Sequence, residues 1–295
     1  MNTPYHPTLR SALSLVLVLA GCASGSDPVP TAECLRDPGC TRVMVAAHRG
    51  DHTSLPENSL AALRAAAVLG AELVEVDVWP TSDEQVVLMH SANVDSTTDG
   101  SGALADMTWA QVQALTLNGA DPDDPETQRV PLFSEALALA RELSVMLYVD
   151  QKTLRWELVL DDIQAGAYHE QAVVRDSSQT VLEKMKALDE RLTVMPTISS
   201  GASLAPMMQA LPDVTIVELT HHQPWPELCE SIIESGLKVQ QDVLGYGDDE
   251  AEQGDYSAWK EYVDSGVTLL QTDLPQQLVP AIRSFNDSGV FPDAP

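Results

Sequence analysis

Eight short apolar runs, rich in β-branched residues, recur along the chain after residue 42. Their hydrophobicity is nearly continuous rather than alternating, which is typical of parallel strands that are covered on both faces. The runs occupy residues 43–47, 73–78, 145–149, 171–174, 192–195, 214–219, 237–241 and 267–270. The pattern therefore predicts eight buried parallel strands.

Stretches with helical spacing of apolar residues lie between these runs. Asn58 is predicted to cap a helix that Gly70 ends, and Pro131 is predicted to open another. Eight strand–helix units in a body near the ~250 residues typical of that fold predict an α/β protein, a TIM (β/α)8 barrel over residues 43–287. A doubly wound open sheet is the alternative, but no glycine-rich phosphate-binding turn follows the first strand.

One interval after the second predicted strand, about residues 79–131, is much longer than a strand-to-helix loop requires. It contains a short apolar run at 85–89, a turn-rich stretch at 95–102, a helical stretch at 108–115 and an acidic loop at 121–126. We interpret it as an insertion over the carboxyl-terminal mouth of the barrel, where long loops often carry function.

The first 21 residues are typical of a secretory signal peptide, because their apolar run at 12–20 is shorter than the ~20 residues of a spanning helix. Residues 19–22 (LAGC) resemble the lipobox of bacterial lipoproteins, in which Cys22 would become the lipid-bearing N-terminus. The alternative is an ordinary signal peptide cut near Ala23. With residues 22–42 as a tether, the pattern predicts an exported protein anchored to the bacterial membrane and facing the periplasm or the cell exterior.

Export also changes the interpretation of the other cysteines. Cys34 and Cys40 flank a turn-forming stretch and are able to close a small disulfide loop in an oxidising compartment. Cys229 lies in an apolar helical stretch and is predicted to be a buried free thiol. No paired CxxC spacing indicates a zinc site.

The chain is strongly acidic, with 44 Asp and Glu against 16 Lys and Arg and a net charge of −28. A field of this sign repels nucleic acid, so no nucleic-acid partner is expected. An anionic substrate would need cations placed locally to neutralise it.

Charged side chains gather where the predicted strands end, and a barrel performs its chemistry at that end. The set comprises His48, Arg49, Glu75, Asp77, His90, Asp150 and Lys152. Three carboxylates indicate a hard divalent cation with oxygen ligands, and the basic residues indicate a phosphate oxygen. The two histidines are suited to acid and base catalysis near neutral pH. Each residue alone is also compatible with a structural hydrogen-bond network.

The order and spacing of several motifs resemble those of the glycerophosphodiester phosphodiesterases. The motifs are HRG at 48–50, PEN at 56–58, GAELVEVDV at 70–78, TSD at 81–83, His90, TTDG at 97–100 and TDLP at 272–275. The resemblance extends over about residues 43–284, nearly the whole predicted body.

This resemblance implies a role for each residue at the strand ends. Glu75 and Asp77 would be metal ligands, and His48 and His90 would be the acid–base pair. Arg49 would hold the substrate phosphate. Members of the family typically depend on Ca²⁺ or Mg²⁺ and release an alcohol and glycerol 3-phosphate from a small phosphodiester.

The family's later Glu-x-Lys step is matched by Asp150 and Lys152, so Asp150 would be the third metal ligand, one methylene shorter than Glu, and Lys152 would bind phosphate. Ser91 stands where the family has an aspartate after the second histidine, and residues 237–243 lack the family's tryptophan. These departures keep two alternatives open. One is a phospholipase D-like enzyme that cleaves lysophospholipid or sphingomyelin head groups, and the other is a non-catalytic binding lipoprotein.

Three further histidines are interpreted separately. His221 and His222 follow the sixth predicted strand, where a second metal site is conceivable, but solvated loop residues are the preferred interpretation because no acidic residue has a suitable spacing. His169 precedes the fourth strand, at the face of a barrel that serves stability, and is predicted to be structural.

Overall fold

The computed structural model describes residues 30–220 and 225–295. The predicted signal peptide, the lipobox with Cys22, and His221 and His222 lie outside the described residues. Among the described residues, no helix is both long and apolar enough to cross a membrane.

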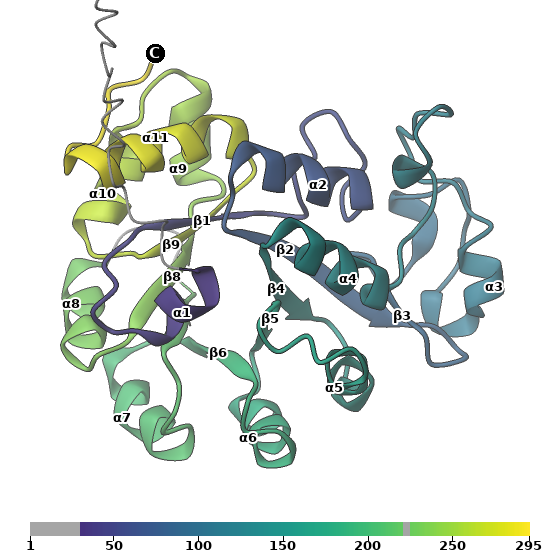
Figure 1. The fold of residues 1–295 in the computed structure, drawn as a ribbon, viewed down its shortest axis with the longest axis horizontal. Helices are drawn as coiled ribbons and strands as arrows, with labels where there is room; N and C mark the ends of the chain where they lie inside the picture. The colour runs from purple at the N-terminus through teal and green to yellow at the C-terminus, as the bar shows by residue number, and fades with distance from the viewer. Residues whose placement is uncertain (1–29, 221–224) are drawn as a thin grey trace, which may run out of the picture.

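Eight parallel strands close into a barrel surrounded by helices (Figure 1). The strands are β1 (Met44–Ala47), β2 (Leu73–Pro80), β4 (Met146–Gln151), β5 (Ala172–Asp176), β6 (Thr193–Ile198), β7 (Ile216–Leu219), β8 (Lys238–Asp242) and β9 (Leu269–Thr272). The ring is closed because β1 pairs in parallel with both β2 and β9. The predicted TIM barrel is confirmed, and the open-sheet alternative is wrong.

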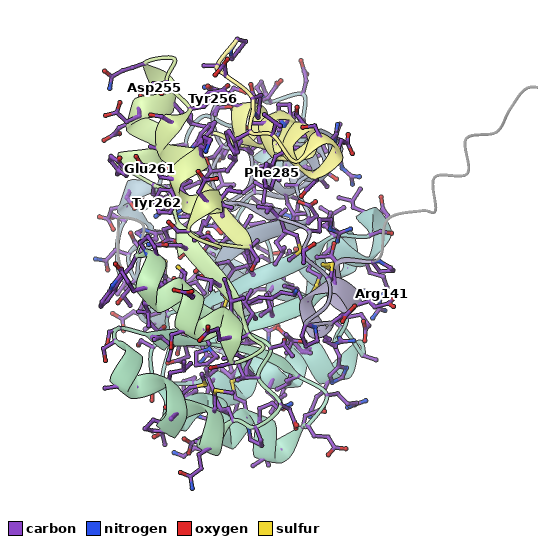
Figure 2. The ribbon with its side chains drawn as sticks, turned by 90° about the vertical axis from the view of Figure 1, so that its left-hand side faces the viewer. Arg141, Asp255, Tyr256, Glu261, Tyr262 and Phe285 are labelled. Atoms are coloured by element: carbon purple, nitrogen blue, oxygen red, sulfur yellow. A yellow bond between two sulfur atoms is a disulfide. The ribbon has the colours of Figure 1, made fainter. Side chains whose placement is uncertain are left out.

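The outer face of the barrel is covered by helices whose apolar sides share one large core with the outward-facing strand residues. The helices are α2 (Leu60–Leu69), α4 (Phe133–Leu143), α5 (Trp156–Ala165), α6 (Gln179–Leu188), α7 (Gly201–Ala210), α8 (Pro226–Glu234), α9 (Tyr246–Glu252), α10 (Ser257–Asp264) and α11 (Pro275–Ser288). Figure 2 shows the outer layer from the side, where Tyr256 and Tyr262 are buried while Asp255 and Glu261 are exposed. The acidic residues of this segment therefore form a solvated shell.

Two predicted helix starts need correction. Ser59, not Asn58, caps α2, because its hydroxyl accepts the backbone N–H of Ala62 at 3.0 Å. Pro131 does not open α4, because its carbonyl is taken up by the backbone N–H of Leu88 and the helix begins two residues later. Gly70 ends α2 in the left-handed conformation as predicted.

The long interval after β2 forms a small lobe that extends outward beside that strand (Figure 1). It contains β3 (Val86–Leu88), which pairs antiparallel with β2, the short helix α3 (Trp109–Val112), and three 3₁₀ turns. The lobe has an apolar core of its own, made of Val87, Met89, Val94, Leu104, Val112, Leu117 and Val130. β3 thus continues the barrel sheet, and His90 follows it after one residue, Met89.

The amino-terminal end of the barrel is closed by α1 (Thr31–Arg36), a helix within the stretch that was expected to be only a tether. Ala32, Cys34 and Leu35 pack against the inward-facing apolar residues of the strands, which are Met44, Ala46, Leu73, Met146, Tyr148, Val173, Met195, Ile216 and Leu269. A disulfide joins Cys34 to Cys40, and the Lys238 ammonium donates to the Cys40 carbonyl at 2.5 Å. Cys229 is a buried free thiol. The helix is therefore part of the folded barrel.

We expect Leu35→Ala to lower the free energy of unfolding by about 2–5 kcal/mol, because the side chain is fully buried in the barrel floor and its removal leaves a cavity. Leu154→Ala is the matched control, since Leu154 is 90% exposed and should change stability by no more than about 0.5 kcal/mol. Urea unfolding of both variants measures the difference. Equal stabilities would show that α1 does not close the barrel.

Candidate active site

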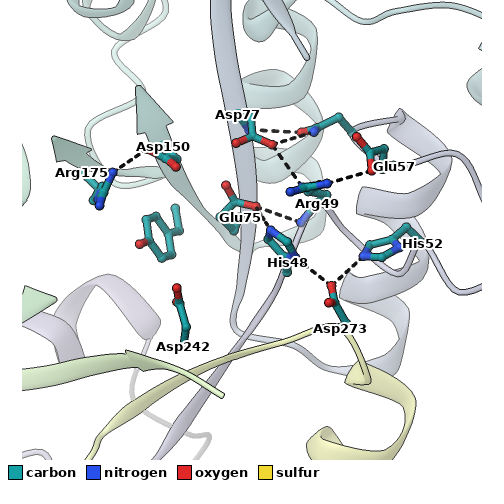
Figure 3. A network of polar contacts seen from close by, with 12 residues as sticks. His48, Arg49, His52, Glu57, Glu75, Asp77, Asp150, Arg175, Asp242 and Asp273 are labelled. Atoms are coloured by element: carbon teal, nitrogen blue, oxygen red, sulfur yellow. Dashed lines mark hydrogen bonds and ion pairs between the residues drawn. The ribbon is translucent and has the colours of Figure 1, made fainter. Parts of the chain in front are cut away.

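Five of the polar residues predicted at the strand ends meet at one mouth of the barrel, as Figure 3 shows for His48, Arg49, Glu75, Asp77 and Asp150. Because side chains alternate along a strand, Glu75 and Asp77 of β2 both point inward, and Asp150 of β4 does the same. β2 and β4 pair in register, with Asp77 opposite Asp150. Parallel pairing therefore brings the three carboxylates together.

Oxygen atoms of Glu75, Asp77 and Asp150 all lie within 4.8 Å of one another. Glu75 and Asp77 are buried, and Asp150 is partly buried. Burial, with the charges of Asp77 and Asp150 added to it, raises the pKa of Glu75 well above its usual range. Three crowded, oxygen-only donors that repel one another are suited to a hard divalent cation, so these residues fit the predicted metal site.

Three cationic side chains lie against this carboxylate group. Lys152 donates to Asp150 and its Nζ lies 3.1 Å from Asp77. Arg49 Nη1 lies 2.9 Å from Glu57, and its Nε lies 3.4 Å from Asp77. Both cations were predicted to bind phosphate, and the structure places them beside the carboxylates.

Arg175 of β5 is the third cation, and it was not among the residues predicted for the site. Its Nη1 lies 3.1 Å from Asp150 and its Nε lies 2.8 Å from Glu218 of β7. Glu218 also accepts from Tyr148 at 3.0 Å and Thr197 at 2.6 Å. Arg175 directly follows the predicted strand 171–174, so the strand-end rule was sufficient to find it.

The HRG and PEN motifs form a backbone cradle for this group. Arg49 and Asn58 both have a left-handed backbone, with φ of 54° and 55°. The Arg49 N–H donates to Glu75 at 2.9 Å, and Asn58 exchanges two hydrogen bonds with Asp77. A Cβ at Gly50 would lie 2.6 Å from the backbone of α2, which accounts for the glycine.

His48, which follows β1, is oriented by Asp273 at the end of β9 (Figure 3). The distance from His48 Nδ1 to Asp273 Oδ1 is 2.7 Å, so Nδ1 carries the proton that the carboxylate accepts. Nε2 then faces the carboxylate group, 4.0 Å from Glu75. Asp273 lies in the TDLP motif, but the sequence analysis gave it no role.

His52 is a second histidine on the same carboxylate oxygen, and no sequence motif indicated it. Its Nε2 lies 2.8 Å from Asp273 Oδ1, and this hydrogen bond raises the pKa of His52. Although burial opposes the change, the hydrogen bonds from His48 and His52 hold the pKa of Asp273 below its usual range. Asp273 is therefore an ionised carboxylate between two imidazoles.

The turn that carries Asp273 is fixed by Asp248 of α9. The buried Asp248 carboxylate accepts from the backbone N–H of Asp273 at 2.7 Å, the Thr272 hydroxyl at 2.8 Å and the Trp259 indole at 2.9 Å. Burial raises the pKa of Asp248 to about 6. Asp248 lies in the acidic helix α9, next to the exposed Asp249.

His90 follows β3, and its backbone carbonyl accepts from the Trp79 indole at 3.2 Å. Burial lowers the pKa of its imidazole, which favours the neutral form near pH 7. Ser91, which replaces the aspartate of the family pattern, accepts from the Ser96 hydroxyl at 3.5 Å. His90 is thus held through its backbone.

Two further residues lie at opposite ends of the barrel. Asp242 of β8 is at the mouth and accepts from the Gln240 amide at 2.9 Å. Burial and the charge of Glu218 raise its pKa. His169 is buried and lies 2.9 Å from Asp189, so it has the structural role predicted for it.

The chain forms a closed parallel barrel, and charged groups gather at the carboxyl ends of its strands. This arrangement is typical of TIM-barrel proteins that have their functional site at that mouth. The model of the Glycerophosphoryl diester phosphodiesterase family matches residues 48–276, and the chain belongs to this family.

Two curated relatives show the extent of the similarity. Glycerophosphodiester phosphodiesterase 1 of Mus musculus is 41% identical over 137 residues, which cover 43% of this chain and 39% of the relative. The chain thus spans about two fifths of the length of the mammalian relatives that it matches. A glycerophosphodiester phosphodiesterase of Caldanaerobacter subterraneus is 23% identical over 248 residues, which cover 82% of this chain and 98% of the relative.

Solved structures share the fold. A glycerophosphoryl diester phosphodiesterase from Parabacteroides distasonis has a TM-score of 0.73 at 20% identity, over 86% of this chain and 91% of that one. A phosphodiesterase from Oleispira antarctica, solved in complex with the product sn-glycerol-3-phosphate, has a TM-score of 0.67 at 22% identity, over 85% of this chain and all of that one.

We expect stability to fall between pH 4 and pH 6 because of Asp248. A carboxyl with a folded-state pKa of about 6 binds more protons in the folded chain than in the unfolded chain over this range, so raising the pH favours unfolding, by up to about 3 kcal/mol. Asp248→Asn removes this titration and should flatten the pH dependence. Asp287→Asn, at an exposed position that makes no ion pair with the residues that the structure describes, is the matched control and should leave it unchanged. Urea unfolding at pH 4, 5 and 6 measures the slopes, and identical slopes in wild type and Asp248→Asn would contradict the assignment.

Proposed function

We propose that the protein hydrolyses glycerophosphodiesters to an alcohol and glycerol 3-phosphate. The observation that carries the proposal is the carboxylate group of Glu75, Asp77 and Asp150 with the oriented imidazole of His48 beside it, in a member of this family. The product bound to the Oleispira antarctica phosphodiesterase supports the same chemistry for a barrel of this fold.

Glu75, Asp77 and Asp150 would hold Ca²⁺ or Mg²⁺. Such a cation would neutralise the phosphodiester and polarise its P–O bonds when bound. Lys152 and Asp150 form a close pair, and Arg175 also contacts Asp150, so Asp150 shares its charge among more partners than Glu75 does. This supports Asp150 as a weaker ligand than Glu75.

Arg49 and Lys152 would bind the non-bridging phosphate oxygens. Both lie within 3.4 Å of Asp77, so a phosphate beside the carboxylate group would come within their reach. Arg49 is also held by Glu57, which fixes the plane of its guanidinium. A fixed, planar donor is well suited to a phosphate oxygen pair.

His90 and His48 would move the protons. His90 is neutral near pH 7 because burial lowers its pKa, so it is suited to accept the proton of the attacking water. The Asp273 carboxylate accepts the Nδ1–H of His48 and so orients the ring, whose Nε2 would give a proton to the leaving alcohol oxygen. One P–O bond forms to water and one breaks to the alcohol, which keeps the phosphate on glycerol.

We also propose that the protein is exported and anchored through a lipid on Cys22. The supporting structural observation is the disulfide between Cys34 and Cys40, since disulfides persist in oxidising compartments.

Turnover with defined substrates tests the activity. We expect the purified protein to release glycerol 3-phosphate from glycerophosphocholine, to lose this activity with a chelator, and to recover it with Ca²⁺ or Mg²⁺. Phosphorus NMR identifies the product. Preference for a lysophospholipid would favour the phospholipase D-like alternative, and the absence of turnover on both with metal present would favour a binding lipoprotein.

His48→Ala and His90→Ala should each reduce kcat by at least a hundredfold, because general acid–base catalysis typically contributes 10²–10⁴-fold. The wild-type rate should be bell-shaped with pH, and each variant should lose one limb. His169→Gln, at the opposite end of the barrel, is the control for a general effect of losing a histidine. Full activity in His90→Ala would remove His90 from the mechanism.

Fractionation of cells tests the anchor. We expect the mature protein to sediment with membranes and Cys22→Ala to move it to the soluble fraction, since removal of the acyl chains removes the membrane affinity. Cys229→Ala should not change the distribution. A wild-type protein found entirely in the soluble fraction would contradict lipid anchoring.

A further inference from the structure

Among the residues that the structure describes, His52 is a histidine at the mouth that the proposed reaction leaves without a function. His52 lies in the loop after β1, and its Nε2 and the Nδ1 of His48 approach the same oxygen of Asp273, at 2.8 and 2.7 Å. Ligand atoms of His48, His52 and Asp273 all lie within 4.8 Å of one another. Two imidazole nitrogens therefore approach one carboxylate oxygen, and the three donor atoms form a single cluster (Figure 3).

We propose that His48, His52 and Asp273 form a second metal site, specific for a borderline transition metal such as Zn²⁺, and that its occupation inhibits the enzyme by withdrawing His48 from the reaction. The binding part of this proposal is independent of the proposed function, and the inhibition rests on it.

The donor set distinguishes this site from the carboxylate group. Imidazole nitrogen suits Zn²⁺ and its neighbours in the transition series, whereas carboxylate oxygens alone suit Ca²⁺ and Mg²⁺. Two histidines and one aspartate, with water as a fourth ligand, are a common arrangement for an open zinc site. The two sites at the same mouth would thus select different cations.

The three ligands are already held in place. Asp273 is fixed through its backbone N–H by Asp248, and the His48 backbone N–H donates to the Thr272 carbonyl at 3.0 Å. The loop of His52 is tied to α11, because the Gln276 amide donates to Asp51 at 3.0 Å. Held ligands reduce the ordering that a metal would otherwise have to impose.

The site is also accessible. The side chain of His52 is 25% exposed and that of Asp273 is 42% exposed, which leaves a solvent side for entry and for a water ligand. The net charge of −28 attracts cations to the surface. An ion therefore does not have to pass through the carboxylate group to reach Asp273.

Metal binding has a direct consequence for His48. To bind a cation through Nδ1, the ring must give up the N–H that it now donates to Asp273, and its proton moves to Nε2. Nε2 is the nitrogen that faces Glu75, 4.0 Å away. A His48 held by metal at Nδ1 is unable to form the imidazolium that protonates the leaving oxygen.

Zinc binding to the full folded chain tests the site, with Ca²⁺ or Mg²⁺ in excess to fill the carboxylate group. Competition with a chromophoric chelator measures the Zn²⁺ affinity, and Co²⁺ substitution reports tetrahedral nitrogen coordination by its visible spectrum. We expect His52→Gln, which keeps a donor for Asp273, to weaken Zn²⁺ binding at least tenfold and to lose the Co²⁺ spectrum. The double variant His221→Gln/His222→Gln is the control and should bind as wild type does.

Inhibition of turnover is the second measurement. Zn²⁺ should inhibit turnover by the wild type, and adding excess Ca²⁺ or Mg²⁺ should not restore the activity. His52→Gln should need at least a tenfold higher Zn²⁺ concentration for the same inhibition. Equal Zn²⁺ affinity in wild type and His52→Gln would overturn the proposal, as would inhibition that excess Mg²⁺ relieves in full. Zn²⁺ binding that depends on His52 in a chain without turnover would contradict the proposed function while supporting the site.

Discussion

The mutual repulsion of three crowded carboxylates is the constraint on which the rest of the mouth depends. Glu75, Asp77 and Asp150 are brought together by strand pairing, which holds their oxygen atoms within 4.8 Å of one another. Charges of one sign in such a place are tolerated only with partners close by. The cations Arg49, Lys152 and Arg175, together with the amide of Asn58, supply those partners. A bound divalent cation would replace part of this compensation and free Arg49 and Lys152 for a phosphate.

The barrel interior divides into two layers with different purposes. Its lower layer is apolar and is sealed by Leu35 and the Cys34–Cys40 disulfide. Its upper layer is a continuous polar network that includes Tyr148, Glu218 and Arg175. The apolar floor keeps the strands in register, and the register fixes the distances between the charged groups above it.

The sequence was sufficient to predict the barrel and the residues at its strand ends, because both follow from local signals: apolar runs and the residues that end them. It was not sufficient for partners that meet only through closure of the barrel. His48 and His52 follow the first strand, whereas Asp273 follows the last, and no spacing reports that contact.

Other features escaped because their local composition pointed elsewhere. Asp248 lies among acidic residues that are exposed on neighbouring positions, and only the fold shows that its carboxylate is enclosed by Trp259 and Thr272. The helix α1 has just three buried residues in a stretch rich in proline, glycine and charge, too few to produce a helical period. Asn58 was predicted to cap a helix because Asn side chains commonly accept a backbone N–H at a helix start. The N–H that Asn58 accepts belongs instead to Asp77.

The position of α1 also sets the orientation of the molecule if the chain is anchored through Cys22. The first described residue, Pro30, leads directly into this helix at the floor of the barrel, and the residues between it and Cys22 span at most about 30 Å when fully extended. The floor would then face the membrane and the mouth with Glu75 and His48 would face away from it. Substrate would arrive from the aqueous side, so a water-soluble phosphodiester would reach the site more readily than a phospholipid embedded in the anchoring membrane.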